Sequence, residues 1–176
     1  MSENVDVVLR RCIRDVPDFP KPGILFKDIT PLLASPQAFN LVIDTMAEQY
    51  DGHGVDVIVA IEARGFIFGA ALAARMRKAF APARKPGKLP AAKHRVEYQL
   101  EYGTDAIEMH NDAIKQGDKV LVVDDVLATG GTAAATCQLV QQMGGQVVGA
   151  SFVIELAFLS GRTRLLPLEV SSLVQY

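Results

Sequence analysis

Tryptophan is absent from this sequence, and cysteine is scarce, with only Cys12 and Cys137 far apart in the chain. The two match no zinc-ligand spacing, and a chain of 176 residues that is 49% hydrophobic can bury a core without disulfides or metals. We therefore expect a reducing, cytoplasmic environment. No segment approaches the roughly 18 uninterrupted apolar residues of a membrane-spanning helix, and residues 1–14 lack the apolar region of an export signal.

An excess of charge of either sign is also lacking. With 18 basic and 20 acidic residues, the formal net charge is -2. The overall electrostatic field therefore gives no reason to expect binding to nucleic acid or to a membrane, and any anion site must be local. Neither G-x-x-x-x-G-K-[ST] nor G-x-G-x-x-G occurs in the chain, which excludes the two commonest nucleotide-binding motifs.

What the sequence does contain is an alternation of helical and extended patterns. Apolar residues at helical spacing alternate with unbroken apolar runs of the kind found in strands buried on both faces. We expect helices at residues 3–13, 35–50, 65–78 and 131–143, and strands at residues 55–61, 119–124 and 147–154. Strand, helix and strand in this order imply a right-handed crossover in a parallel sheet, with ligands beyond the carboxyl ends of the strands.

Three further segments lie outside this alternation. The Pro-rich stretch 19–29 indicates a packed loop or an edge strand. The basic segment 84–93, which contains Pro and Gly, indicates a mobile loop. Residues 96–102 and 106–110 alternate weakly around a turn at 103–105, which indicates a β-hairpin or flap.

The loop between the strand at 119–124 and the next helix carries the strongest functional signal. Asp124 and Asp125 end the strand, and Thr129-Gly130-Gly131-Thr132 opens the helix. Adjacent glycines let backbone N–H groups approach an anion, the helix N-terminus adds partial positive charge, and threonine hydroxyls donate further hydrogen bonds. The two carboxylates would repel that anion and need hydroxyl groups or Mg²⁺ instead. A ribose 5-phosphate satisfies both halves of the loop.

A simpler interpretation is that the aspartates cap the helix and the glycines only permit a tight turn, but capping needs one carboxylate rather than two. Segment 120–132, Val-Leu-Val-Val-Asp-Asp-Val-Leu-Ala-Thr-Gly-Gly-Thr, closely resembles the phosphoribosyl-pyrophosphate signature of type I phosphoribosyltransferases. Its second half is most similar to family members that act on adenine, where Leu is more usual than Val126. The resemblance covers roughly residues 15–160.

The resemblance implies an α/β fold with a parallel sheet, helices on both faces, a small N-terminal hood and a flexible flap. Residues 1–176 would form a single domain, with the arm and hood at 1–34 and the flexible loop and flap at 84–110. The implied reaction joins adenine to the ribose of phosphoribosyl pyrophosphate, giving AMP and pyrophosphate. Mg²⁺ would be carried by the substrate rather than held by protein side chains, and the active unit would be a homodimer.

The resemblance also assigns residues to the sugar phosphate. Those implied to bind ribose 5-phosphate are Asp124, Asp125, Ala128, Thr129, Gly130, Gly131 and Thr132. Asp125 is in addition implied to be catalytic. Its negative charge would lie near the cation that develops on the ribose as pyrophosphate departs.

Two basic segments are similar to the family's pyrophosphate-binding pieces. Glu62-Ala63-Arg64-Gly65-Phe66 implies that role for Arg64, and Arg84-Lys85-Pro86-Gly87-Lys88 implies it for Arg84 and Lys88, with Arg84 reaching across a dimer interface. Arginine suits the task because its planar fork binds two phosphate oxygens at once. Without the resemblance, Arg64 could equally be a surface ion-pair partner of Glu62, and the basic segment a solvated charged loop.

The remaining implied residues belong to the flap and the base site. Glu101 takes the place of the acid proposed to handle the purine proton, and Tyr102 helps to shape the closed site. Phe26 and the main chain at Leu25 would bind adenine from the hood, with Leu156 on the other face of the base. Taken singly, Glu101 could be merely solvent-exposed and the hood an ordinary packed apolar loop.

Three other functions stay open at this point. The sugar loop says nothing about the base, so the specificity could be for hypoxanthine, guanine or xanthine. The chain could instead be a regulator that keeps the sugar-phosphate pocket without chemistry, or a plain α/β scaffold. Arg64 and Glu101, each within a full motif, argue against the regulator, and the several independent motif matches argue against the scaffold.

Overall fold

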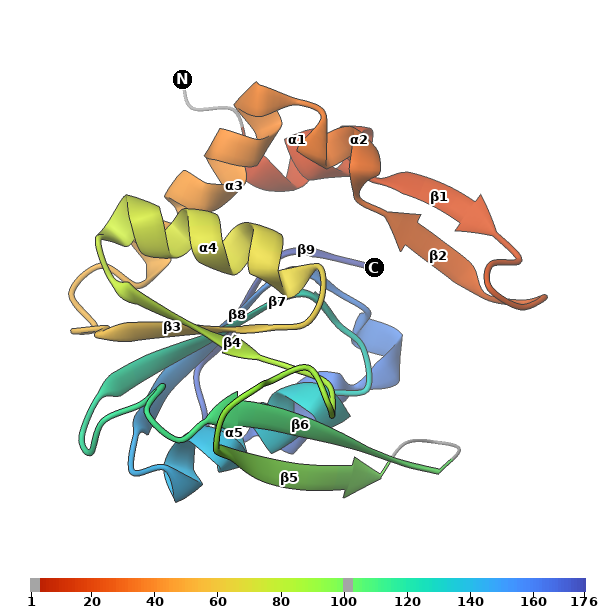
Figure 1. Ribbon diagram of the computed structural model, residues 1–176. Helices are drawn as coiled ribbons and strands as arrows, with labels where there is room; N and C mark the ends of the chain where they lie inside the picture. The colour runs from red at the N-terminus through yellow and green to blue at the C-terminus, as the bar shows by residue number, and fades with distance from the viewer. Residues whose placement is uncertain (1–3, 100–102) are drawn as a thin grey trace.

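The computed structural model describes residues 4–99 and 103–176 of the chain. At its centre is a five-stranded sheet in which all neighbours are parallel, in the order β4-β3-β7-β8-β9 (Figure 1). The strands are β3 (Val57–Ile61), β4 (Ala79–Ala83), β7 (Lys119–Leu127), β8 (Gln146–Glu155) and β9 (Val170–Gln175). The parallel sheet predicted from the sequence is confirmed.

The two edge strands are the ones that the sequence pattern does not predict. β4 contains Pro82, which lacks a backbone N–H and is tolerated in a sheet only at an edge or bulge. β9 carries the half-buried polar residues Ser171 and Ser172 and so lacks an apolar run. Both strands are specified by their pairing with a neighbour rather than by their own composition.

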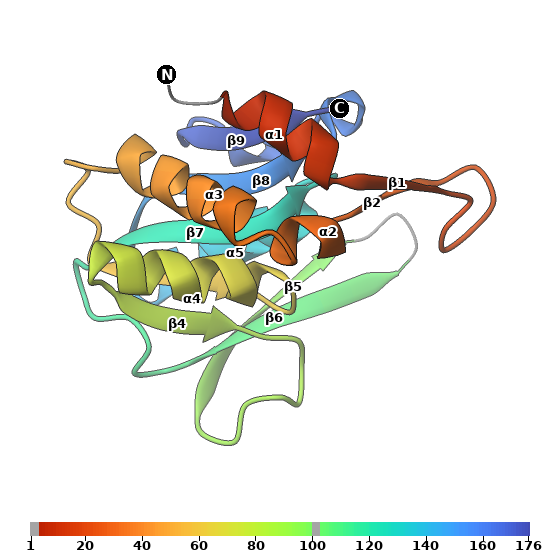
Figure 2. The same cartoon turned by 90° about the horizontal axis from the view of Figure 1, so that it is seen from above.

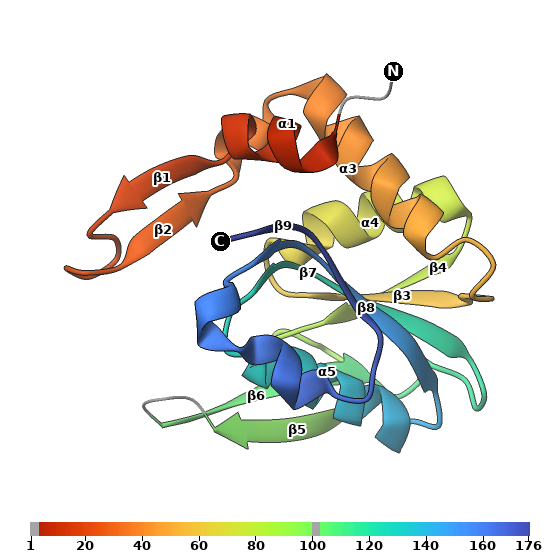
Figure 3. The ribbon, with the colours of Figure 1, turned by 180° about the vertical axis from the view of Figure 1, so that it is seen from behind.

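Both faces of the sheet are covered, which explains why its inner strands are apolar throughout. Ile58 and Leu121 belong to a core on one face, whereas Val59 and Val122 belong to a core on the other. The α-helices of the described residues cover both faces, most of them the first (Figures 1 and 3). They are α1 (Val5–Cys12), α2 (Thr30–Leu33), α3 (Pro36–Gln49) and α4 (Gly65–Met76), with α5 (Gly131–Gln142) opposite.

Local capping signals set where the first long helices begin. The Ser35 hydroxyl accepts a hydrogen bond from Ala38 N at 3.3 Å, and Pro36 occupies the first helical position of α3. Asn4 caps α1 by accepting from Asp6 N at 3.0 Å. Both predicted helices are therefore confirmed, with their ends shifted by one or two residues.

Two antiparallel hairpins project to the same side of the molecule, beyond the carboxyl ends of the central strands (Figures 1 and 2). β1 (Arg14–Pro17) pairs with β2 (Leu25–Asp28) to form the hood. β5 (Lys93–Gln99) pairs with β6 (Thr104–His110), which confirms the predicted hairpin. Glu101 and Tyr102 lie outside the described residues.

The β5–β6 hairpin lies beside α5 on the second face of the sheet. Val96 and Ile107 of the hairpin share a core with Leu139 of α5 and with Ala81 of the edge strand β4. Two short 3₁₀ helices, η1 (Ala157–Leu159) and η2 (Gly161–Leu165), connect β8 to β9. Within the described ranges, no helix is both long and apolar enough to cross a membrane.

Candidate active site

The loop from β7 to α5 has the geometry of an anion cradle. Gly130 has a left-handed φ of +78°, and α5 begins at the next residue, so the N–H groups of its first turn lack helical partners. Residues 126–133 line a small hollow of about 80 Å³. The placement of this loop at the carboxyl end of a central strand, opening a helix, agrees with the sequence prediction.

Gly161 of η2 lies directly behind this loop, and sequence reasoning missed it. A Cβ at Gly161 would lie 2.1 Å from the carbonyl oxygen of Ala128, and a Cβ at Gly130 would lie 2.3 Å from the carbonyl oxygen of Gly161. Only glycine fits at either position without moving backbone. The loop between β7 and α5 is thus supported from behind by a segment about 30 residues further along the chain.

The paired aspartates occupy a buried position at the end of β7. The side chain of Asp125 is only 6% exposed, and Asp124 Oδ1 accepts a hydrogen bond from Asp125 N at 2.9 Å. Burial raises the pKa of Asp124 well above its usual value, and the charge of Asp125 raises it further. Burial also raises the pKa of Asp125, although the Arg64 guanidinium opposes that rise. The pair is therefore electrostatically costly in the unliganded protein.

Replacing Asp124 with asparagine is expected to raise thermal stability at neutral pH. An acid whose pKa is raised by folding loses stability as the pH rises from its unfolded-state pKa through its folded-state pKa. Asparagine keeps an oxygen for Asp125 N but carries no charge. We expect Tm to rise by roughly 2–4 °C, the shift that about 1 kcal/mol produces in a domain of this size. Calorimetry at pH 7 and at acid pH checks this, because the gain should shrink where native Asp124 is protonated, and an unchanged or lower Tm at pH 7 would contradict it.

Arg64 links the aspartates to the hood. It lies just before the first residue of α4, and its Nε is 2.8 Å from Asp125 Oδ2. Its guanidinium also lies over the ring of Phe26 in β2, 5.2 Å from the ring centroid. Gly65 permits this arrangement, because a Cβ there would lie 2.7 Å from Asp124 Oδ1. The alternative pairing of Arg64 with Glu62 is not the one that the structure contains.

Glu62 instead pairs with Arg84 of the basic loop. The Arg84 guanidinium donates to both carboxylate oxygens of Glu62, at 3.1 and 3.2 Å, and also to the carbonyl oxygen of Lys88 at 3.1 Å. Hydrogen bonds from Arg84 lower the pKa of Glu62. The side chain of Lys88 is exposed. In this single chain, the loop is thus anchored through Arg84, and the mobility expected for it stays a prediction.

The residues implied for the base lie around the same edge of the sheet. Phe26 stacks edge-on against Phe19, with ring centroids 5.2 Å apart, and the neighbouring Leu25 is 49% exposed. Leu156 follows the end of β8 and is held by a hydrogen bond from its N–H to the carbonyl oxygen of Leu127, at 2.9 Å. Phe26 of the hood therefore lies beside Arg64, and the backbone of Leu156 is held next to the carboxyl end of β7.

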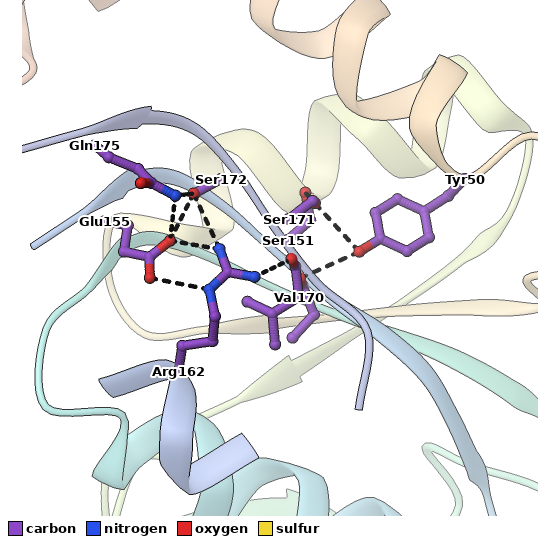
Figure 4. Close-up of polar contacts among 9 residues, drawn as sticks. Tyr50, Ser151, Glu155, Arg162, Val170, Ser171, Ser172 and Gln175 are labelled. Atoms are coloured by element: carbon purple, nitrogen blue, oxygen red, sulfur yellow. Dashed lines mark hydrogen bonds and ion pairs between the residues drawn. The ribbon is translucent and has the colours of Figure 1, made fainter. Parts of the chain in front are cut away.

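A partly buried ion pair lies at the end of β8, as Figure 4 shows. Arg162 of η2 binds both oxygens of Glu155, at 3.1 and 2.5 Å. Ser172 and Gln175 of β9 donate to Glu155 Oε2 at 2.7 and 3.2 Å. The bonds from Arg162 contribute most to the lowered pKa of Glu155. This network ties together β8, η2 and β9 immediately beside Leu156.

Sequence reasoning also missed this network, because its members are separated by 7, 17 and 20 residues and form no local motif. A larger hollow of about 520 Å³ lies elsewhere, between α5 and residues 164–169. It is bordered by Val147 and Glu169, which lie at the amino ends of β8 and β9. Ligands of parallel sheets bind at the opposite ends, so we place the site at the phosphate loop.

Comparison with known proteins agrees with this geometry. The phosphoribosyl transferase domain family matches residues 29–164. An adenine phosphoribosyltransferase of Solibacter usitatus is 58% identical over 168 residues, covering 96% of this chain and 97% of the relative. The crystal structure of the adenine phosphoribosyltransferase from Thermoanaerobacter pseudethanolicus matches with a TM-score of 0.93 and 50% identity, covering 96% of this chain and 98% of that one.

The Saccharomyces cerevisiae adenine phosphoribosyltransferase, solved with adenine and an imino-altritol bisphosphate, matches with a TM-score of 0.90 and 39% identity over 96% of this chain and 98% of that one. Both the sequence relatives and the structural matches cover nearly the whole chain. The chain belongs to the phosphoribosyl transferase family and, within it, to the adenine phosphoribosyltransferases.

Proposed function

We propose that this chain transfers the 5-phosphoribosyl group of phosphoribosyl pyrophosphate to adenine, giving AMP and pyrophosphate. The position of Arg64 carries the proposal, since its Nε lies 2.8 Å from Asp125 and its guanidinium 5.2 Å from the ring centre of Phe26. The carboxylate of Asp125, the guanidinium of Arg64 and the aromatic ring of Phe26 thus lie side by side. The yeast relative, solved with adenine and a sugar-like bisphosphate, supports the same ligand classes.

At the ribose, N9 of adenine would attack C1 as the bond from C1 to the pyrophosphate oxygen breaks. The 5-phosphate would be held by the backbone N–H groups and hydroxyls of residues 128–132. Asp124 and Asp125 would accept hydrogen bonds from the ribose hydroxyls and place negative charge near the positive charge that develops on the sugar. Because the carboxylates are buried, that charge would act in a medium of low polarity, where it has a larger effect.

The pyrophosphate would face Arg64, Arg84 and Lys88. Arg64 is paired with Asp125 and Arg84 with Glu62, which holds both guanidinium groups in defined positions. Among the described residues, no group of three or more His, Cys, Asp or Glu side chains could hold a metal. Mg²⁺ would arrive on the substrate and, when bound, would neutralise charge on the leaving pyrophosphate.

The purine would stack on Phe26, with the main chain at Leu25 reading its edge and Leu156 closing the other face. Backbone groups can present both a donor and an acceptor, which the N6 amine and N1 of adenine require. Glu101 would handle the purine proton, and Tyr102 would shape the closed site. Both of these residues lie outside the described ones, so their roles rest on the resemblance of the flap segment.

The proposal includes a homodimer in the cytoplasm. Ile67 and Phe80 are 40% and 38% exposed, and Phe80 packs edge-on against Phe66, which gives α4 and β4 an apolar outer surface suited to a second copy. Arg84 follows directly after β4, a position from which it could reach the active site of a partner subunit. Cys12 and Cys137 are free thiols, which is in keeping with a reducing compartment.

AMP formation from adenine, phosphoribosyl pyrophosphate and Mg²⁺ tests the function directly. We expect AMP and pyrophosphate in equal amounts. We also expect kcat/KM for adenine to be at least about 100-fold above that for hypoxanthine, because the protein groups that hydrogen-bond the N6 amine would be left unpaired by the oxygen of hypoxanthine. Parallel reactions with guanine and xanthine cover the other specificities. Preference for another base would overturn the choice of adenine, and no pyrophosphate release with any purine would favour a binding module without chemistry.

A further inference from the structure

Three segments of the proposed site meet at one phenol, that of Tyr98 in β5. Lys85 of the basic loop (residues 84–88) donates a hydrogen bond to Tyr98 Oη at 2.7 Å, and Thr132 of the phosphate loop (residues 128–132) donates one at 3.0 Å. Tyr98 itself donates to Asp105 Oδ2 of β6 at 3.2 Å. Lys85 also forms an ion pair with Asp105. The proposed reaction gives none of Lys85, Tyr98 and Asp105 a role.

The hydrogens available at this junction limit which hydrogen bonds can exist at the same time. A phenol has one hydrogen, which Tyr98 gives to Asp105, so Lys85 and Thr132 supply the hydrogens of their own bonds. The Thr132 hydroxyl also has one hydrogen, and here it is directed at Tyr98. A 5-phosphate that accepts this hydrogen must therefore remove one hydrogen bond from Tyr98.

The rest of the junction ties the hairpin to the basic loop. Burial lowers the pKa of Lys85, but the hydrogen bonds that Lys85 donates to Asp105 and Tyr98 outweigh it and hold that pKa above its usual value, so Lys85 stays charged. The Tyr98 ring also lies at the start of α5, where a Cβ at Gly131 would be 3.6 Å from Tyr98 Cδ2. The phenol is thus in contact with α5, β6 and the basic loop at once.

We propose that Tyr98 is a positioning residue that couples occupation of the phosphate loop to the placement of the β5–β6 hairpin and of the basic loop. The proposal rests on the proposed function, because it takes the 5-phosphate of the substrate as the ligand of Thr132. Coupling of this kind is reciprocal: a phosphate that draws Thr132 away changes what holds the hairpin, and the hairpin's position changes the affinity for the phosphate.

Tyr98→Phe tests the coupling, since it removes the hydroxyl and keeps the ring. Without its competitor, Thr132 is free to bind phosphate, so calorimetry should give a Kd for ribose 5-phosphate that is unchanged or up to about fivefold lower, the scale of one neutral hydrogen bond. The kcat for AMP formation should fall about tenfold, because hairpin and basic loop no longer respond to the bound phosphate. A merely structural role would instead weaken binding and turnover together.

Hydrogen exchange gives a second readout. Ribose 5-phosphate should change amide exchange in residues 93–99 and 104–110 of the wild type and leave it unchanged in Tyr98→Phe. Tyr50→Phe is the matched control: it also removes a phenolic hydroxyl, but one that is hydrogen-bonded to Ala150 of β8 and Ser171 of β9. This control variant should lower Tm, but it should not lower kcat selectively while leaving the Kd for ribose 5-phosphate unchanged or lower.

The outcomes separate the two proposals. A wild type that forms no AMP from adenine would overturn the proposed function. An active wild type together with unchanged kcat in Tyr98→Phe, or with weaker ribose 5-phosphate binding in that variant, would overturn the coupling alone. Amide exchange that responds to ribose 5-phosphate equally in the wild type and in Tyr98→Phe would also overturn the coupling.

Discussion

Asp125→Asn is expected to lower kcat for AMP formation by about two to three orders of magnitude, the usual cost of losing one charge-stabilising group at a reacting centre. The asparagine keeps the shape of the side chain but removes the negative charge that would face the developing cation. It also leaves Arg64, now 2.8 Å from Asp125, without a charged partner. Steady-state kinetics with saturating adenine and phosphoribosyl pyrophosphate measures the effect.

The loss should be chemical rather than structural. Burial already raises the pKa of Asp125, so a neutral side chain of the same shape costs little in folding, and Tm should change by no more than a few degrees. Asp118→Asn is a suitable control, because Asp118 lies at the other end of the same strand, where it accepts a hydrogen bond from Lys115 N at 2.8 Å. Full activity in Asp125→Asn would refute the assigned role.

Arg64→Ala is expected to reduce kcat/KM for phosphoribosyl pyrophosphate by about 100-fold to 1000-fold, in line with the loss of a bidentate, charge-assisted contact of several kcal/mol. The kcat/KM of Arg64→Lys should lie between those of the wild type and of Arg64→Ala, because lysine keeps the charge but not the planar fork. Arg75→Ala is the matched control: Arg64 precedes the start of α4, whereas Arg75 lies in its last turn and pairs there with the exposed Asp44. Activity there should be unchanged.

Arg64→Ala also has a consequence for the pH dependence of kcat/KM. Arg64 opposes the effect of burial on Asp125, so its removal should raise the pKa of that carboxyl further. If Asp125 must be ionised for transfer, the acid limb of the kcat/KM profile should move to higher pH in Arg64→Ala and stay in place in Arg75→Ala. An acid limb that does not move would show that Asp125 and Arg64 are not coupled during turnover.

The parts of the site that could be predicted from sequence are those in which neighbouring residues act together. Segment 120–132 forms strand, turn and helix start within one short stretch, and its glycines and hydroxyls indicate an anion site without reference to the rest of the chain. The two inner strands beside it were predictable for the same reason, because burial on both faces requires an unbroken apolar run.

The supports of the site could not be predicted, because they depend on contacts between distant segments. Nothing local marks Gly161 as the residue behind the phosphate loop, or Arg162 as the partner of Glu155. Tyr98 lies on a weakly alternating strand, and its three hydrogen-bond partners come from three other segments. For Arg64, sequence allowed either pyrophosphate or Glu62 as a partner, and the partner in the unliganded fold is Asp125, which only the meeting of α4 with β7 brings within reach.

Gly130 and Gly161 constrain one another in a way that bears on how this enzyme can change over time. Each would place a Cβ against the other segment's backbone, at 2.3 and 2.1 Å, and a backbone atom cannot be exchanged for a smaller one. A substitution at one glycine therefore has no compensating substitution at the other, unlike a clash between two side chains. Laboratory evolution that diversifies the base site should leave this pair untouched, and grafting the phosphate loop onto another scaffold should succeed only if the segment behind it is transferred too.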